Sequence, residues 1–299
     1  MKIWRAILMA LAISAAPALA QDAAAPAPPP PAPQVLSQLF WQASDARLQR
    51  FTGIDTDDGV AVIMVTDEGV LAQGRLERAG DGRITGVQPQ QIRYLRDPDG
   101  APLTGPRRNA QAVALGDGGR IFVAFQGYGR VLAYAAPDAS ATQLAGHPDF
   151  ARLTVGAGLT GLAVSRSGVL YAIPERAARM TYGTPSYHFW NGEWAGSFRL
   201  PADGQFHPVG ADIGPDGRLY ILERERAAEG RRVQLRRFIL QGSRIDAGTV
   251  VMRSAFGQFS DLSGVSVWGR GNGPLRGLMT GYARGPGARS EIVELALPR

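Results

Sequence analysis

The same pattern of polar and apolar residues recurs five times along the chain. In each copy a short apolar segment leads into a turn that ends on glycine, and in four copies a second segment rich in β-branched and aromatic residues follows. Short runs of this kind, bounded by turn residues, predict β-strands. The copies are FTGIDTDDG (51–59), RNAQAVALGDG (108–118), GLTGLAVSRSG (158–168), HPVGADIGPDG (207–217) and DLSGVSVWGRG (261–271).

The spacing of these copies indicates the architecture. Asp-Gly and Asn-Gly pairs within them and between them are typical of β-hairpin turns. A unit of roughly 50 residues built from antiparallel hairpins is typical of a β-propeller, in which each blade is a four-stranded sheet. We therefore predict an all-β fold, a β-propeller of five or six four-stranded blades. The turns close at Gly59, Gly118, Gly168, Gly217 and Gly271, at intervals of 59, 50, 49 and 54 residues.

Segments near both ends of the chain are predicted to pair and close the ring of blades. The last apolar segment, EIVELAL (291–297), is placed to pair with an N-terminal strand and close the ring. A sixth blade would come from residues 59–108 or from strands at both ends. Apolar residues with helical spacing occur only around Leu36–Leu48. Because each blade packs on its neighbours, residues 35–299 are expected to form one propeller domain.

Residues 1–20 have the pattern of a secretory signal peptide. Two basic residues precede an apolar stretch from Ile7 to Ala16, and the motif Ala-Leu-Ala follows at 18–20. The stretch is shorter than the roughly 20 residues that span a bilayer. We predict cleavage after Ala20 and a periplasmic or secreted protein, with an uncleaved, membrane-retained signal as the alternative. Residues 21–34, rich in proline and alanine, are predicted to form an extended spacer.

Composition excludes several classes of function. The chain has no cysteine, which excludes disulfides, thiolate catalysis and thiolate-bound metals. Removal of Lys2 and Arg5 with the signal peptide would lower the formal net charge from +6 to +4. The remaining basic residues are arginines scattered between acids, so we expect no nucleic-acid partner. No other segment is apolar enough to span a membrane, and a monomer is expected.

Candidate functional residues follow from the propeller geometry. The first strand of each blade lines the central channel, and polar residues at its ends form the channel mouth. The first strands contribute Asp55, Asp57, Asn109, Gln111, Thr160, Asp212 and Ser263. The second strands end on Asp67, Gln126, Glu175, Glu223 and Arg224. Carboxylates that meet at one mouth can hold a hard cation such as Ca²⁺, whereas charges at strand ends can also simply face the solvent.

Other catalytic patterns are missing from the sequence. The three histidines, His147, His188 and His207, do not have the spacing of a metal site. The chain contains no G-x-S-x-G nucleophile elbow. It also contains no G-x-x-x-x-G-K-[ST] phosphate loop, because its only lysine is Lys2.

Several segments resemble the phytase-like family of secreted bacterial β-propellers, which is described by the esterase-like activity of phytase. The resemblance covers most of residues 51–267. It implies hydrolysis of an ester or phosphate ester by a metal-bound water, and the expected cofactor is either Ca²⁺ or none. The segments are TDEGVLAQGRLER (66–78), RNAQAVALGDGGRIFVAFQGYGRVLAYA (108–135), GLTGLAVSRSGVLYAIPE (158–175), GADIGPDGRLYILERE (210–225) and DLSGVSVW (261–268).

The chain departs from this family at its acidic positions. Amides and hydroxyls ligate calcium only weakly without charged partners, so the implied metal site is weakened. The residues that replace the acids of relatives are Asn109, Gln111, Gln126, Thr160 and Ser263. The metal ligands that the resemblance leaves are Asp67, Glu175 and Glu223. The catalytic residues that it implies are Glu175, Glu223, Arg224 and Arg130, the two arginines holding an oxyanion or phosphate.

Three functions remain open from the sequence. The first is a metal-assisted (phospho)ester hydrolase with a degraded acidic site, acting on a small ester or phosphate ester. The second is a non-catalytic propeller that binds a ligand or a protein partner through the same mouth. The third is a lactonase-like propeller, for which the sequence has no specific motif.

Overall fold

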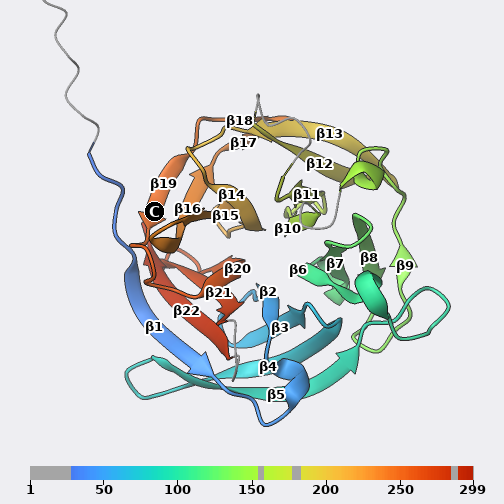
Figure 1. The fold of residues 1–299 in the computed structure, drawn as a ribbon, viewed down its shortest axis with the longest axis horizontal. Coiled ribbons are helices and arrows are strands. Elements are labelled where there is room, and N and C mark those ends of the chain that lie inside the picture. Colours follow the sequence, from blue (N-terminus) through green and yellow to red (C-terminus); the bar gives the residue numbers. More distant parts are fainter. Residues whose placement is uncertain (1–27, 154–157, 177–182, 284–288, 299) are drawn as a thin grey trace, which may run out of the picture.

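The computed structural model describes residues 28–153, 158–176, 183–283 and 289–298. Five four-stranded antiparallel sheets surround a central axis, as blades of a propeller (Figure 1). The predicted signal peptide and residues 21–27 of the predicted spacer lie outside the described residues. No helix in the described part of the chain is long and apolar enough to cross a membrane.

The blades follow one another in chain order, each beginning with the strand nearest the axis. Blade 1 contains β2 (Phe51–Asp55), β3 (Ala61–Thr66), β4 (Val70–Arg78) and β5 (Ile84–Tyr94). Blade 2 contains β6 (Ala110–Leu115), β7 (Ile121–Phe125), β8 (Arg130–Tyr134) and β9 (Thr142–Gln143). Blade 3 contains β10 (Leu159–Val164), β11 (Leu170–Pro174), β12 (Thr184–Trp190) and β13 (Glu193–Leu200).

The last two blades complete the ring. Blade 4 contains β14 (His207–Ile213), β15 (Leu219–Ala227), β16 (Gly230–Phe238) and β19 (Thr249–Arg253), with a short hairpin of β17 (Leu240–Gln241) and β18 (Arg244–Ile245) inserted. Blade 5 contains β20 (Asp261–Trp268), β21 (Leu275–Tyr282), β22 (Ser290–Leu297) and β1 (Gln34–Trp41). Four short 3-10 helices are described at Ala46–Leu48, Gly105–Arg108, Asp117–Gly119 and Phe150–Arg152.

The ring is closed by the two ends of the chain, as predicted. β1 pairs antiparallel with β22 and forms the outer strand of blade 5 (Figure 1). The prediction of a helix around Leu36–Leu48, which the spacing of apolar residues permits, is wrong. Ser37, Leu39 and Trp41 are more buried than their neighbours, so β1 has the two-residue period of a strand, and only Ala46–Leu48 is helical. The blade number is five, because residues 59–108 complete blade 1.

Glycine allows the first strands to pack closely around the axis. The five glycines that close the repeated turns all have positive φ, as the turn prediction requires. Gly210 on β14 has a different role. A Cβ atom there would lie 2.4 Å from the backbone oxygen of Ser263 in the next blade. The glycine in the repeated motif therefore keeps neighbouring blades in backbone contact at the axis.

Candidate functional site

Each first strand carries a β-bulge at the same place in the repeat. The extra residue lies directly before the glycine, or before Ala112 in blade 2, where the register with the second strand shifts. A bulge turns its side chain away from the regular alternation of the strand. Three bulge hydroxyls donate hydrogen bonds to backbone oxygens of the next blade, at 2.9–3.1 Å. The bulge residues are Thr52, Gln111, Thr160, Val209 and Ser263.

All five blades contribute to a polar cavity beside these bulges. It has a volume of about 250 Å³, and we call it the polar mouth. Its walls come from the starts of the first strands and from the ends of the second strands. Its charged residues are three arginines and three carboxylates. The lining residues are Arg50, Thr52, Asp67, Asn109, Gln111, Gln126, Glu175, Arg224, Arg226, Asp261, Ser263 and Tyr282.

Three amide side chains of blade 2 form a hydrogen-bonded chain in the polar mouth. Gln111 Nε2 donates to Asn109 Oδ1 at 2.6 Å, and Asn109 Nδ2 donates to Gln126 Oε1 at 3.2 Å. An amide carries both a donor and an acceptor, so neighbouring amides in such a chain can satisfy one another's hydrogen-bonding groups. Carboxylates at the same positions would have acceptors only and would repel one another.

The carboxylates of blades 3 and 5 are bound to one arginine of blade 4. Arg224 lies 2.6 Å from Asp261 and 3.5 Å from Glu175, and its side chain is 9% exposed. Arg226 lies 3.7 Å from Asp261. Burial lowers the pKa of Arg224, and the two carboxylates oppose that shift. Both acids are therefore neutralised within the protein.

The third carboxylate, Asp67, is bound to Arg50 and Tyr282. Arg50 forms an ion pair with Asp67, and the Tyr282 hydroxyl donates to Asp67 Oδ2 at 3.1 Å. Burial raises the pKa of Asp67, which both partners oppose. Asp67 Oδ1 and Arg50 Nε are buried without a hydrogen-bond partner among the described residues. Because neither atom is accessible to solvent, the contacts that this ion pair can offer to a molecule in the cavity come from the more exposed parts of Arg50, whose side chain is 43% exposed.

Comparison with known proteins places the chain in a family. A family model named phytase-like, esterase-like activity of phytase, matches residues 46–262. The chain belongs to the phytase-like family. No curated protein matches its sequence.

Solved structures with a similar fold share little sequence with this phytase-like chain. Virginiamycin B lyase from Staphylococcus aureus is 14% identical, with a TM-score of 0.44 over 88% of this chain and 74% of the lyase. A protein of unknown function from Dyadobacter fermentans is 13% identical, with a TM-score of 0.45 over 82% of this chain and 75% of the other.

The polar mouth does not fit the metal that the phytase-like resemblance implies. Ca²⁺ prefers six to eight oxygen ligands, several of them charged. Here Asp67, Glu175 and Asp261 are each paired with an arginine, and the amides of blade 2 bind one another. No group of three or more histidine, cysteine, aspartate or glutamate side chains that could hold a metal occurs in the described residues.

The structure places Glu223 outside the polar mouth. The lining positions at the ends of the second strands are equivalent in register and are Asp67, Gln126, Glu175, Arg224 and Tyr282. Glu223 precedes Arg224 by one residue, so its side chain points to the other face of β15. There it is 1% exposed and bound to Arg236 and Gln234.

Five other predicted residues also do not line the polar mouth. Arg130 lines a different cavity, between the 3-10 helices of blade 2. Thr160 is buried and donates to the backbone oxygen of Pro208. Asp55, Asp57 and Asp212 lie near or just after the ends of their first strands and line a cavity at the opposite mouth of the channel. The prediction that these three aspartates share a mouth with Asn109 is wrong, because the two ends of a strand lie on opposite sides of the ring.

Sequence reasoning missed Arg50, Asp261, Arg226 and Tyr282. A closer alignment of the repeats would have found two of them. Arg50 and Asp261 lie two residues before the bulges of their blades, at the position that Asn109 occupies in blade 2. Tyr282 occupies the position of Asp67, but on a strand that lacks the sequence pattern of the other second strands, and Arg226 lies two residues beyond the equivalent position on β15.

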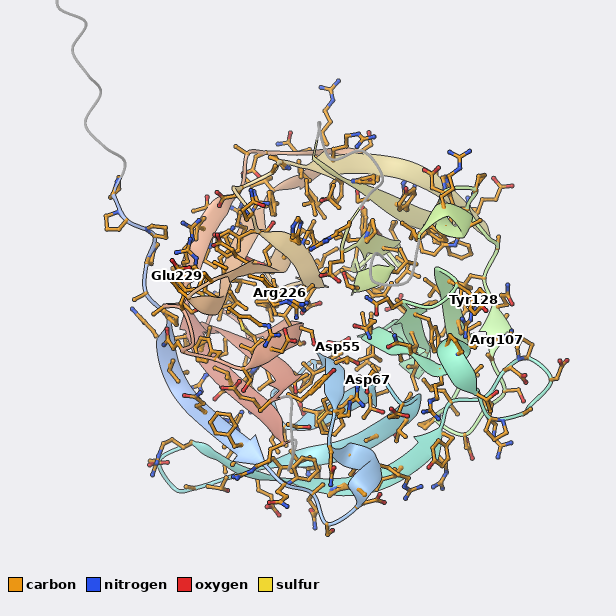
Figure 2. The ribbon with its side chains drawn as sticks, viewed as in Figure 1. Asp55, Asp67, Arg107, Tyr128, Arg226 and Glu229 are labelled. Atoms are coloured by element: carbon orange, nitrogen blue, oxygen red, sulfur yellow. The ribbon has the colours of Figure 1, made fainter. Side chains whose placement is uncertain are left out.

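A second cavity, of about 320 Å³, lies at the opposite mouth, beside the turns after the first strands. Two aspartates line it. Asp55 accepts hydrogen bonds from Leu115 N of blade 2 at 2.6 Å and from Ser266 Oγ of blade 5 at 2.8 Å. Asp212 accepts from Val267 N of blade 5 at 2.5 Å. These carboxyl groups connect blades 1, 2, 4 and 5 (Figure 2 shows Asp55 near the axis).

The two aspartates have raised pKa values. Burial raises the pKa of Asp55 to about 6 and, together with the charge of Asp55, raises that of Asp212 well above its usual range. The hydrogen bonds from Leu115 and Val267 oppose these shifts. In its ordinary range an aspartate would already be ionised at pH 5. The folded protein therefore binds more protons than the unfolded chain between about pH 4 and pH 6.

We expect stability to fall as the pH rises through this range. At pH 7 the ionised Asp55 carboxylate must be held in a buried place, at a cost on the order of 1–3 kcal/mol. Asp55→Asn should flatten the dependence of the melting temperature on pH between 4.5 and 7.5, whatever its effect on absolute stability. Thermal unfolding across this range checks it, with the exposed Asp138→Asn as control. If the melting temperature of Asp55→Asn depends on pH as steeply as that of the wild type, Asp55 is not the group responsible.

Proposed function

We propose that the polar mouth binds a small, neutral, polyhydroxylated ligand of about monosaccharide size, without a metal ion. The observation that carries this proposal is the charge balance of the lining. Arg50, Arg224 and Arg226 face Asp67, Glu175 and Asp261. A cation would have to displace arginines, and a polyanion would have to displace carboxylates. A neutral ligand displaces neither.

Hydrogen bonding supports the same class of ligand. Each hydroxyl of a polyol both donates and accepts, and it needs partners of both kinds. The chain of Gln111, Asn109 and Gln126 offers both kinds at one wall. At another wall, the partly exposed guanidinium groups of Arg50 and Arg226 can donate to ligand hydroxyls. The signal-peptide pattern at 1–20 supports export, so we propose that the ligand is met outside the cytoplasm.

Ester hydrolysis is the second candidate, and membership of the phytase-like family favours it. In this case Glu175 would activate a water molecule as general base and Arg224 would stabilise the developing oxyanion. Glu175 and Arg224 both line the polar mouth, and their side chains lie 3.5 Å apart. In the structure the Glu175 carboxylate is bound to Arg224 and would have to give up part of this contact to take a proton from water, which is why we place this function second.

Binding and turnover measured together test the proposal. Full-length mature protein is titrated calorimetrically with myo-inositol, glucose and galactose, and separately with inositol hexakisphosphate and CaCl₂. Esterase and phosphatase activity is followed with p-nitrophenyl acetate and p-nitrophenyl phosphate, with and without chelator. We expect binding of a neutral polyol that chelator does not change. Gln111→Ala should weaken it about tenfold, as loss of a buried hydrogen bond to ligand does. The exposed Gln90→Ala is the control.

Two results would overturn the proposal. Tight binding of the hexakisphosphate without binding of any neutral polyol would show that the mouth prefers anions. Calcium-dependent turnover that Glu175→Gln abolishes would establish the hydrolase instead.

A further inference from the structure

Blade 2 contains a second, larger cavity, away from the polar mouth. Its volume is about 1000 Å³, and it lies beside the 3-10 helices Gly105–Arg108 and Phe150–Arg152. Figure 2 shows Arg107 and Tyr128 toward the outside of the ring, whereas Asp67 lies near the axis. We call it the blade 2 cavity. Its walls are largely apolar, and its residues include Val131, Leu144, Phe150 and Leu153.

A buried arginine forms part of this apolar wall. Arg130 is 9% exposed, and its guanidinium group lies 4.3 Å from the centre of the Phe125 ring. It donates hydrogen bonds to the backbone oxygens of Gly127, at 3.0 Å, and of Arg107. No carboxylate among the described residues forms an ion pair with it.

An unneutralised buried charge is costly and calls for an explanation. Two neutral carbonyl groups and an aromatic face stabilise a guanidinium group less than a carboxylate does. The nearby side chain in the cavity wall, Arg107, adds a second positive charge. Burial and Arg107 lower the pKa of Arg130 to about 10, so it stays charged at neutral pH. The cavity therefore offers two positive charges against an apolar surface.

The rim of the blade 2 cavity carries an exposed aromatic residue in an unusual conformation. Tyr128 is 69% exposed and has φ +62°, which is uncommon for a bulky side chain. Its two glycine neighbours lie against the 3-10 helices. A Cβ atom on Gly127 would lie 2.2 Å from Pro106 O, and one on Gly129 would lie 2.6 Å from Phe150 O. The clamped loop thus presents the tyrosine ring at the entrance, and backbone strain of this kind concentrates at binding sites.

From this arrangement we propose that the blade 2 cavity binds a small amphipathic organic anion. Its carboxylate would lie against Arg130 and Arg107, and its aliphatic or aromatic body against Leu144, Phe150 and Leu153. Tyr128 would close over the entrance. This site is separate from the polar mouth and does not depend on the function proposed there.

Octanoate is a suitable probe, with 1-octanol as its uncharged counterpart. Calorimetric titration of the full-length mature protein should give saturable binding of octanoate at one site and at least about tenfold weaker binding of 1-octanol, because the alcohol lacks the charge-assisted hydrogen bonds. Arg130→Gln should weaken octanoate binding by about tenfold or more. Since Arg130 is buried, the exposed Arg107→Gln serves as a second variant that keeps the fold, with a loss of about fivefold expected.

Controls separate this site from the rest of the molecule. Arg93→Gln, an exposed arginine in blade 1, should leave octanoate binding unchanged, and so should Gln111→Ala in the polar mouth. Tyr128→Gly should relieve the backbone strain, raise or maintain the melting temperature, and still weaken octanoate binding. The proposal is overturned if octanoate does not bind, if octanoate and 1-octanol bind equally, or if Arg107→Gln and Arg130→Gln bind like wild type.

Discussion

Replacement of Glu223 by glutamine is expected to lower the free energy of unfolding by about 3–5 kcal/mol. Glu223 is 1% exposed, and Arg236, its partner on β16, is 4% exposed. Arg236 Nε donates to Glu223 Oε2 at 2.7 Å, and Gln234 Nε2 donates to the same oxygen at 2.8 Å. Glutamine would leave Arg236 buried without its counter-ion. The substitution should lower stability without changing the polar mouth, so the molecules that remain folded should still bind the ligand.

The same strand provides a matched control. Glu225 lies two residues further along β15 and pairs with Arg232 at 2.5 Å, but this pair is more exposed. Glu225→Gln should therefore cost about 0–1 kcal/mol. Urea unfolding followed by circular dichroism measures both variants. If Glu223→Gln is as stable as Glu225→Gln but loses ligand binding, Glu223 belongs to the functional site after all.

The sequence predicted the fold well because turn chemistry is local. Positive φ at the closing glycines and at Asn191-Gly192 is dictated by the residues themselves, so the hairpins could be located without any tertiary information. The number of blades depends on a pairing between residues far apart in the chain. β1 and β22 pair across the whole domain, and nothing local distinguishes this closure from an extra blade.

The polar mouth could be predicted only in part. The structure brings Asn109, Gln111, Gln126, Glu175 and Asp67 together in the lining of one cavity, because their positions recur with the strands, and their functional role stays a prediction. The prediction for Glu223 is one residue out of register. Because side chains alternate along a strand, an error of one residue puts the side chain on the opposite face of the sheet. Arg224 of blade 4 neutralises Glu175 of blade 3 and Asp261 of blade 5. These ion pairs could not be predicted, because no sequence pattern links residues that lie in different blades.

The triple variant Asn109→Asp/Gln111→Glu/Gln126→Glu is expected to become dependent on a cation. In the wild-type chain the three amides bind one another at 2.6 and 3.2 Å. As carboxylates they would lose both hydrogen bonds and place three negative charges at hydrogen-bond distance, with Glu175 in the same cavity. We expect a lower melting temperature in chelator and its recovery in excess CaCl₂. At a calcium concentration about 100 times Kd the gain is about 2.7 kcal/mol.

A second triple variant separates the site from the effect of net charge. Gln88→Glu/Gln90→Glu/Gln91→Glu adds the same three charges to exposed positions of β5. Calcium should leave its melting temperature nearly unchanged, because exposed charges are screened by salt. An equal calcium response in both triple variants, or an equally strong response in wild type, would contradict the argument.

Carboxylate and amide side chains have nearly the same shape, so the acidic triple variant changes the charge of the mouth at nearly constant side-chain volume. If it binds calcium and also gains ester turnover, the remaining mouth, with Glu175 and Arg224, is still arranged for hydrolysis, and charge was the missing element. If it binds calcium without turnover, the ion pairs of Arg224 with Glu175 and Asp261 prevent catalysis independently of the metal. In either case the amides of blade 2 are the residues that make a metal unnecessary for the stability of this mouth.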